Sequence, residues 1–286
     1  MIGINSNAAT TRHGSIAVIG FHHAPVNTLA LAMRVAVHRE IRAALADASV
    51  HAIVLAGEGR RFCAGAQITE FASGEIAASP TAHDIWAMIE ASPKPVIAAI
   101  HGYALGGGLE FAMACHYRIA ARDAKLGAPE VKLGLLPGAG GTQRLPRAVG
   151  VERALRMMLE GERYPADGFA DTLMIERFAG IDLPAAALAL AGDLIARDAP
   201  LQRLRDQPVF CRDSKAFFEA QRRHAEAAYP GMFAPPAIVQ CVEAAVRLPF
   251  EEGIAFERAR FNELVNNEQS LALRAAFFAE RHASGR

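Results

Sequence analysis

The stretch Lys94-Pro-Val-Ile-Ala-Ala-Ile-His-Gly-Tyr-Ala-Leu-Gly-Gly-Gly-Leu-Glu110 decides how this chain can fold. The apolar run from Val96 to Ile100 is short and uninterrupted, which is typical of a strand covered on both faces. The three glycines at 106–108 then leave the backbone open to close approach by a ligand atom. The sequence therefore predicts a buried strand that ends at a ligand-binding turn.

A helix that begins at these glycines would bring two useful groups together. The first N–H groups of a helix have no acceptor within it and lie at the positive end of its dipole, so they bind negative oxygen. Glu110 follows Gly107 by three residues and falls on nearly the same face of the turn. This pattern favours proton transfer next to a carbonyl. Simple strand–helix packing is the competing interpretation, with Glu110 as a first-turn acid favoured by the dipole.

Strand-like and helix-like patterns alternate through the first half of the chain, which predicts an α/β fold with a largely parallel sheet. The expected strands are 15–20, 51–56, 96–100 and 117–121, and the expected helices are 29–46, 80–91 and the one after the glycines. In the helix 29–46, Met33, Val37 and Ile41 form an apolar face, and Arg34 is assigned to the opposite, polar face.

From about residue 141 the strand patterns disappear and helical patterns continue. The expected helices are 147–159, 185–196, 214–228, 237–247, 253–266 and 270–283. A change of composition near residue 200 predicts a core over 1–200 and a helical C-terminal extension over 201–286. Apolar faces on the extension need a surface to bury against. We expect them to fold back on their own core and give a monomer, with a homotrimer or hexamer left open.

Composition narrows the function classes. Thirty basic residues balance thirty acidic ones among 286, so neither a nucleic acid nor a membrane surface is indicated as a partner. The N-terminal 14 residues are polar, without a secretory pattern. The four cysteines are far apart, which disfavours a disulfide framework or a metal site and predicts a reducing, cytoplasmic location. They are Cys63, Cys115, Cys211 and Cys241.

Five ordered motifs together carry a family resemblance. They are Phe62-Cys-Ala-Gly-Ala, Lys94-Pro-Val-Ile-Ala-Ala-Ile-His-Gly, Ala104-Leu-Gly-Gly-Gly-Leu-Glu, Gly127-Ala-Pro-Glu and Pro137-Gly-Ala-Gly-Gly-Thr-Gln-Arg-Leu. The chain resembles the enoyl-CoA hydratase/isomerase (crotonase) superfamily, and most of all the N-terminal hydratase/isomerase half of peroxisomal-type multifunctional fatty-acid oxidation enzymes. The resemblance implies an α/β crotonase-type spiral of repeated ββα units, followed by a helical C-terminal region.

The resemblance also assigns roles to residues. Ala66 and Gly107 match the two residues whose N–H groups form the oxyanion hole, and Glu110 and Glu130 match the two catalytic acids. Both acids favour hydration of a trans-2-enoyl-CoA to a 3-hydroxyacyl-CoA in fatty-acid β-oxidation, with delta3-delta2-enoyl-CoA isomerase activity as a second expectation. The alternatives are an enzyme that only isomerises, a thioester hydrolase, a decarboxylase or a non-catalytic acyl-CoA-binding protein.

The substrate implied is an acyl-CoA, and coenzyme A enters as part of it, so no separate cofactor is expected. The residues assigned to coenzyme A binding are Ala64, Ala66, Gln67, Ile68 and Gly107. Gln67 departs from the family, where many members have Asp.

Other interpretations of single features were weighed. A dinucleotide site needs GxGxxG, and the pattern begun at Gly106 ends on Phe111. Arg60, Arg61 and Lys94 fit either coenzyme A phosphates or, for the arginines, a solvated face. Cys63 is expected to be a buried packing thiol.

Overall fold

The computed structural model describes residues 7–283, with side chains as far as residue 280. The first six residues, part of the segment judged to lack a secretory pattern, lie outside this range. The chain divides into two compact units, one of residues 1–126 and 164–204 and the other of residues 127–163 and 205–286. One junction lies near the boundary expected at 200, but 127–163 group with the C-terminal helices. The division at 1–200 and 201–286 stays a prediction.

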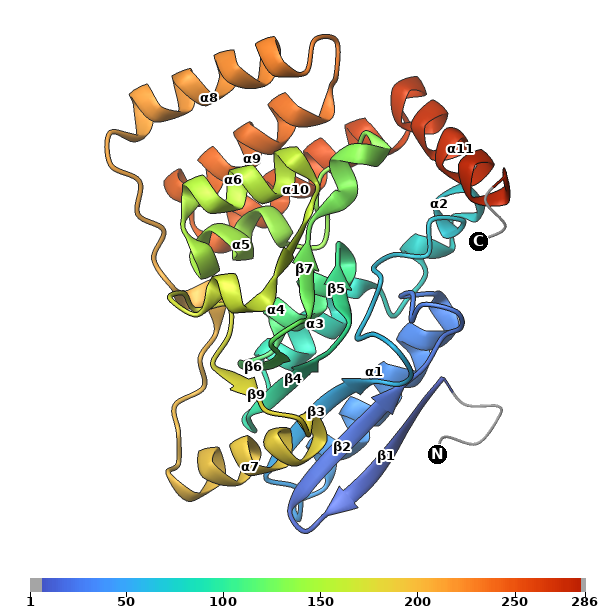
Figure 1. Ribbon diagram of the computed structural model, residues 1–286, viewed down its shortest axis with the longest axis vertical. Coiled ribbons are helices and arrows are strands. Elements are labelled where there is room, and N and C mark those ends of the chain that lie inside the picture. Colours follow the sequence, from blue (N-terminus) through green and yellow to red (C-terminus); the bar gives the residue numbers. More distant parts are fainter. Residues whose placement is uncertain (1–6, 284–286) are drawn as a thin grey trace. The chain divides into compact units, whose positions relative to one another are not determined.

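The first unit contains a six-stranded sheet in the order β1-β2-β3-β4-β6-β9 (Figure 1). Every pair from β2 to β9 is parallel, and β1 is antiparallel to β2, so the largely parallel sheet is confirmed. The strands are β1 (Ala8–His13), β2 (Ile16–Phe21), β3 (Ala52–Gly57), β4 (Val96–Ile100), β6 (Tyr117–Ala121) and β9 (Arg177–Ala179).

A second sheet has three short strands in the order β5-β7-β8. They are β5 (Tyr103–Leu105), β7 (Lys125–Gly127) and β8 (Arg163–Pro165). The expectation that strands end near residue 141 was therefore wrong, because β8 and β9 follow that point. Each has three residues, which is too short for an alternating pattern to be recognised.

Helices cover both faces of the larger sheet (Figure 1). One face carries α1 (Leu31–Ala46), α3 (Ala82–Glu90) and α4 (Gly107–Ala114), and the other carries α7 (Leu183–Ala196). Alternate strand residues such as Val54, Ile97 and Ile119 pack with Leu190 and Leu194 of α7 in one buried cluster. Because both faces are covered, the strands read as continuous apolar runs.

Four aromatic rings pack together on the face of the sheet opposite α7. Trp86 of α3 stacks on Phe111 of α4 with ring centroids 4.8 Å apart. Phe62 lies 5.8 Å from Phe111 and 5.2 Å from Phe21 at the end of β2. Large buried rings contribute much of the packing energy of a core. This cluster therefore holds α4 against the loop that follows β3.

The second unit is mainly helical. It contains the 3₁₀ helix η2 (Pro129–Leu133) and the α-helices α5 (Gly141–Val149), α6 (Val151–Glu160), α8 (Ser214–Ala228), α9 (Ala234–Arg247), α10 (Phe250–Val265) and α11 (Glu268–Ala283). The single helix expected at 147–159 is two helices, because Gly150 between them has φ of +83°. The helix expected at 214–228 is confirmed as α8.

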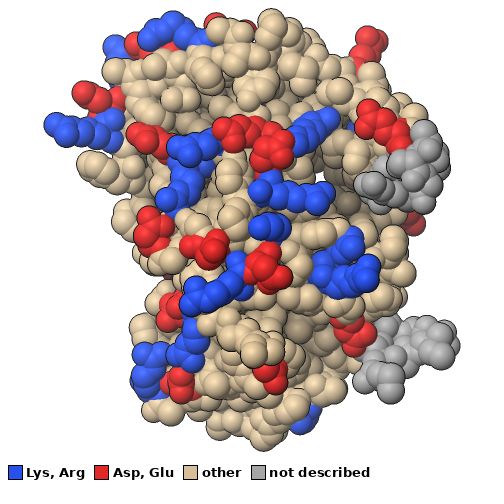
Figure 2. Space-filling model, viewed as in Figure 1, with Lys and Arg blue, Asp and Glu red and all other residues tan. Residues whose placement is uncertain are grey.

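The distribution of charged side chains agrees with the equal numbers of basic and acidic residues. On the face drawn in Figure 2, basic and acidic side chains are interspersed. Within residues 7–283, none of the helices has the length and apolar character required to cross a bilayer.

Candidate active site

Two loops that follow neighbouring parallel strands meet beside β5. β3 pairs with β4, so the loop after β3 and the turn after β4 leave the sheet at the same end. Cys63, in the loop after β3, pairs with β5. Its N–H donates to the Tyr103 carbonyl at 3.1 Å, and its carbonyl accepts from the Leu105 N–H at 3.0 Å. The two loops therefore converge at the start of α4.

This pairing brings Ala66 and Gly107 together. A Cβ placed on Gly107 would lie 3.4 Å from the Ala66 nitrogen, and one placed on Gly65 would lie 3.2 Å from the Gly107 nitrogen. Gly107 is the first residue of α4, where the helix supplies no acceptor. Within residues 7–283 no backbone acceptor is found for either N–H. Two N–H groups close together suit a negative oxygen, although the oxyanion role itself stays a prediction.

Gly108 explains why the turn requires small residues. A Cβ at this position would lie 2.4 Å from the Cys63 carbonyl oxygen and 2.8 Å from the Cys63 Cβ. Any side chain here would push the two loops apart. The glycine therefore permits the close approach on which the pair of N–H groups depends.

Glu110 lies in the first turn of α4 and is 4 % exposed. Its N–H donates to the Gly106 carbonyl at 3.0 Å. The stacked ring of the next residue, Phe111, holds α4 in place. The structure thus places a buried carboxylate one turn from Gly107, within the same unit. This is the arrangement that the spacing of the residues predicted.

Glu130 lies in η2 of the second unit and is half-buried. The helix ends at Gly134, whose φ is +66°. Helix α11 packs on η2, and the buried Ser270 hydroxyl donates to the Leu133 carbonyl at 2.8 Å. The C-terminal extension therefore supports the short helix that carries Glu130. The pairing of Glu130 with Glu110 stays a prediction.

Of the residues assigned to coenzyme A, Gly107 begins α4, and the other four lie along the loop after β3. Ala64 N–H donates to the Val26 carbonyl at 3.2 Å. The Gln67 amide donates to the Thr69 hydroxyl at 2.9 Å, so the departure from Asp is accommodated by a local contact. A hollow of about 430 Å³ borders this loop. Its lining comprises His23, Ala30, Leu31, Ala32, Gln67, Thr69, Glu70 and Glu75.

The sequence analysis did not identify Asn27 as part of this region. Its side chain is buried, and its amide nitrogen donates to the Glu58 and Arg61 carbonyls at 2.8 Å each. Its φ is +55°, a conformation that Asn adopts more readily than most residues. Asn27 therefore fixes the entry to the loop that carries Ala66, and its tolerance of positive φ was the available sequence signal.

Two basic residues have different roles from those expected. Arg34 is 1 % exposed and does not belong to the polar face of α1. Lys94 donates through Nζ to the carbonyls of Ala44, Leu45 and Asp47 at 2.7–2.9 Å, where it satisfies the end of α1. The suggestion that Lys94 meets a phosphate was therefore wrong.

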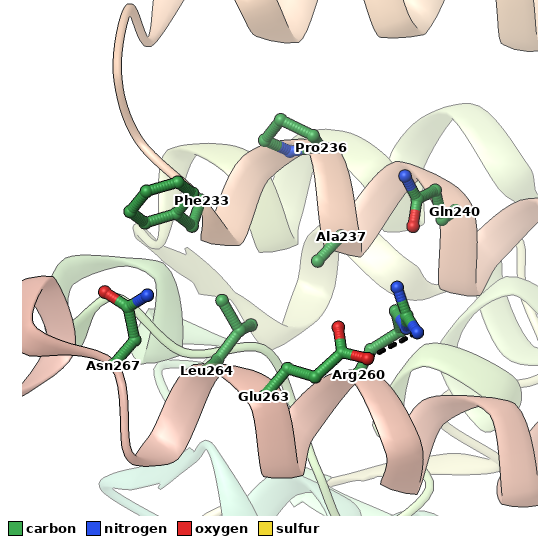
Figure 3. Close-up of a pocket in the computed structure, with 8 residues that line it drawn as sticks. All are labelled: Phe233, Pro236, Ala237, Gln240, Arg260, Glu263, Leu264 and Asn267. Carbon is green, nitrogen blue, oxygen red and sulfur yellow. Dashed lines mark hydrogen bonds and ion pairs between the residues drawn. The ribbon is translucent and has the colours of Figure 1, made fainter.

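Cys63 and the possible metal ligands within the described residues were the other candidates for a reactive centre. Burial raises the pKa of the Cys63 thiol to about 12, which confirms a packing thiol. The described residues contain no group of three His, Cys, Asp or Glu side chains that would hold a metal. In the second unit, a pocket of about 240 Å³ lies between α9 and α10 (Figure 3). Its lining includes an Arg260–Glu263 ion pair and none of the predicted site residues.

A family comparison agrees with this fold. Residues 11–199 match the family described as enoyl-CoA hydratase/isomerase. The chain belongs to this family, and the crotonase-type α/β fold is confirmed.

Individual relatives support the same family assignment. The peroxisomal bifunctional enzyme of Danio rerio is 41 % identical over 270 residues, which cover 94 % of this chain and 37 % of that protein. A probable enoyl-CoA hydratase of Bacillus subtilis is 50 % identical over 152 residues, 51 % of this chain and 59 % of that one. A solved enoyl-CoA hydratase from Bacillus anthracis superposes with a TM-score of 0.63 at 27 % identity, covering 96 % of this chain and 97 % of that one. The chain thus spans little more than a third of the bifunctional relative.

Proposed function

We propose that this chain is an enoyl-CoA hydratase that adds water across the trans-2 double bond of an enoyl-CoA to form a 3-hydroxyacyl-CoA. The observation that carries the proposal is the adjacency of the Ala66 and Gly107 N–H groups, with the buried Glu110 carboxylate one helical turn away. Membership of the enoyl-CoA hydratase/isomerase family supports the same substrate class.

In the proposed reaction, the two N–H groups stabilise negative charge and the carboxyl groups transfer protons. The thioester oxygen accepts hydrogen bonds from the Ala66 and Gly107 N–H groups, and these stabilise the enolate that forms when water oxygen bonds to C3. Losing one such donor typically lowers the rate about 10²–10³-fold. One carboxylate takes a proton from the water, and a carboxylic acid group gives a proton to C2 as the enolate collapses, so H and OH add across the double bond and the two acids together carry the same number of protons as before. General acid–base help of this kind contributes about 10²–10⁴-fold.

Glu110 is proposed as one of the proton-transfer groups because its position is fixed within the same unit as the two donors. The family resemblance assigns the second carboxylate to Glu130. The part of Glu130 is a separate proposal, and Glu130→Gln tests it.

Hydration of crotonyl-CoA and of a longer trans-2-enoyl-CoA tests the proposal. The conjugated thioester loses its ultraviolet absorption as water adds. We expect wild-type turnover with at least one of these substrates and a kcat about 10²–10⁴-fold lower for Glu110→Gln, with little change in KM. Glu226→Gln is the matched control, because this glutamate is exposed on α8. Wild-type turnover by Glu110→Gln would contradict the assignment.

Isomerase activity is the second candidate, and the family description includes it. A trans-3-enoyl-CoA substrate distinguishes the two, because moving the double bond into conjugation increases ultraviolet absorption whereas hydration removes it. Release of free thiol instead would indicate a thioester hydrolase. Tight binding without turnover would indicate a non-catalytic acyl-CoA-binding protein. The cytoplasmic location and the monomeric state stay predictions.

A further inference from the structure

Glu70 is a buried carboxylate that joins two segments of the first unit. It lies in the short helix α2 (Glu70–Ser73), four residues after Ala66. Its Oε1 accepts from the Leu31 N–H at 2.6 Å, at the start of α1. Its Oε2 accepts from Arg34 Nη1 at 3.1 Å, and the two side chains are 7 % and 1 % exposed. The start of α1 and the end of the Ala66 loop therefore share one buried ion pair.

The Arg34 guanidinium is used beyond this pair. It donates to the carbonyls of Leu29 at 3.2 Å, Glu75 at 2.7 Å and Pro80 at 3.1 Å. Arg presents several donors in a rigid planar fork, and a Lys ammonium does not reproduce that geometry. Arg34 thus holds the chain after Ala66, as far as Pro80, against the start of α1.

The start of α1 also contacts the loop itself. Leu29 N–H donates to the Gly65 carbonyl at 2.8 Å, immediately before Ala66. The Leu29 side chain reaches the other donor, because its Cδ1 lies 3.0 Å from the place of a Cβ on Gly107. The Leu29 carbonyl accepts from Arg34, and the rest of Leu29 contacts both residues of the proposed oxyanion hole. Leu29 therefore connects Arg34 to that site.

Stability alone does not account for this arrangement. A buried ion pair must offset the cost of removing both charges from water, and a well-packed apolar pair is often as stable. What the charged pair adds is a single geometry, set by directed hydrogen bonds. Misplacement of a reacting group by about 1 Å can lower a rate about 100-fold.

We infer that Arg34 and Glu70 are positioning residues that set the direction of the Ala66 N–H in the oxyanion hole. Their proposed effect is exerted through the Ala66 N–H and not through the reacting atoms. The inference rests on the proposed function, since it concerns the donor that the thioester oxygen would use.

Three variants test the inference. Arg34→Met removes the cation and its hydrogen bonds while keeping an extended apolar stem. Arg34→Lys keeps the charge but loses the planar fork. Arg12→Met is the matched control, because Arg12 forms an exposed ion pair with Asp47 at 2.9 Å. Should Arg34→Met fail to fold, Glu70→Gln replaces it, since the amide oxygen can still accept from the Leu31 N–H.

The measurements are kcat and KM for hydration and the ultraviolet band of bound sorbyl-CoA, a conjugated dienoyl thioester. Hydrogen bonds to the thioester oxygen pull electrons toward it and shift this band to the red. We expect Arg34→Met to lower kcat about 10- to 100-fold, with a smaller change in KM and a smaller red shift. Arg34→Lys should fall between Arg34→Met and wild type, and Arg12→Met should match wild type.

Two results would overturn the inference. One is a folded Arg34→Met protein with wild-type kcat and red shift. The other is a lower kcat with an unchanged red shift, because the donors would then be intact. The band shift separates this test from the proposed function. A wild-type protein that shifts the band without hydrating any substrate would contradict the hydratase and still allow the comparison. A wild-type protein that leaves the band unshifted would contradict both.

Discussion

Gly107 and Gly108 are adjacent, yet an added methyl group would meet different atoms at each, so alanine substitutions separate activity from folding. At Gly107 the new Cβ would lie 3.0 Å from Leu29 Cδ1 and 3.4 Å from the Ala66 nitrogen. The leucine methyl group can rotate away. The new methyl group remains beside the proposed oxyanion donor.

For Gly107→Ala we expect a free energy of unfolding within about 1 kcal/mol of wild type. Alanine gains about 1 kcal/mol over glycine in a helix, which offsets repacking of the flexible leucine end. The kcat for hydration should fall because the new methyl group crowds the space beside the Ala66 N–H, and full loss of that donor would lower kcat about 10²–10³-fold.

Gly108→Ala should show the opposite pattern. Its Cβ would lie 2.4 Å from the Cys63 carbonyl oxygen, a backbone atom that cannot rotate away. Overpacking of this kind typically costs about 1–3 kcal/mol. Urea unfolding followed by circular dichroism gives the stability of both variants, and loss of the enoyl absorption gives their turnover.

The two variants can refute different steps. Wild-type kcat in Gly107→Ala would show that the thioester oxygen does not bind in the space beside the Ala66 N–H that the methyl group fills. A Gly108→Ala protein as stable as wild type would show that the loop after β3 does not pack on α4 as described.

Three further predictions address the second acid, a buried histidine and assembly. Glu130→Gln should lower kcat about 10²–10⁴-fold with little change in KM, and unaltered turnover would remove Glu130 from the reaction. Burial lowers the pKa of His116 from 6.5 to about 4, so between these pH values the unfolded chain binds the extra proton. Stability should be fully present above pH 6.5 and fall with decreasing pH, by up to about 1.4 kcal/mol per pH unit. Urea titrations should show a flatter slope for His116→Gln, and an equal slope would exclude His116 as the cause. Light scattering at micromolar concentration should give the mass of one chain, whereas a mass of three or six chains would contradict the monomer.

The elements that local patterns predicted are those whose burial repeats along the sequence. β4 begins and ends at the expected residues 96 and 100, and α8 at 214 and 228. β4 is a short, continuous apolar run whose five residues are all buried, and in α8 the apolar residues recur at helical spacing, so both signals are local. β9 has three residues and pairs with the distant β6, so its only signal is long-range.

Arg34 shows a second limit of local patterns. An arginine among apolar residues at helical spacing is expected on the solvated face. Here it is buried because Glu70 and the carbonyls of Glu75 and Pro80, all more than 35 residues away, satisfy its donors. Periodicity describes the helix that carries a side chain and contains nothing about such partners.

The two glycine-rich turns show why a local anion-site pattern is ambiguous. Each leads into a helix, so each has N–H groups that attract negative oxygen. At the start of α5, Gly140 N–H and Thr142 N–H donate at 2.7 Å and 3.0 Å to the fully buried carboxylate of Glu257, more than 110 residues later. The N–H groups of that turn are therefore already satisfied by a carboxylate of the protein itself. At Gly107, residues 7–283 offer the N–H no such acceptor, and a nearby carboxylate, Glu110, belongs to the same helix. A folded protein satisfies most buried N–H groups internally. The N–H groups that it leaves unsatisfied beside a buried acid are therefore the ones that identify the site.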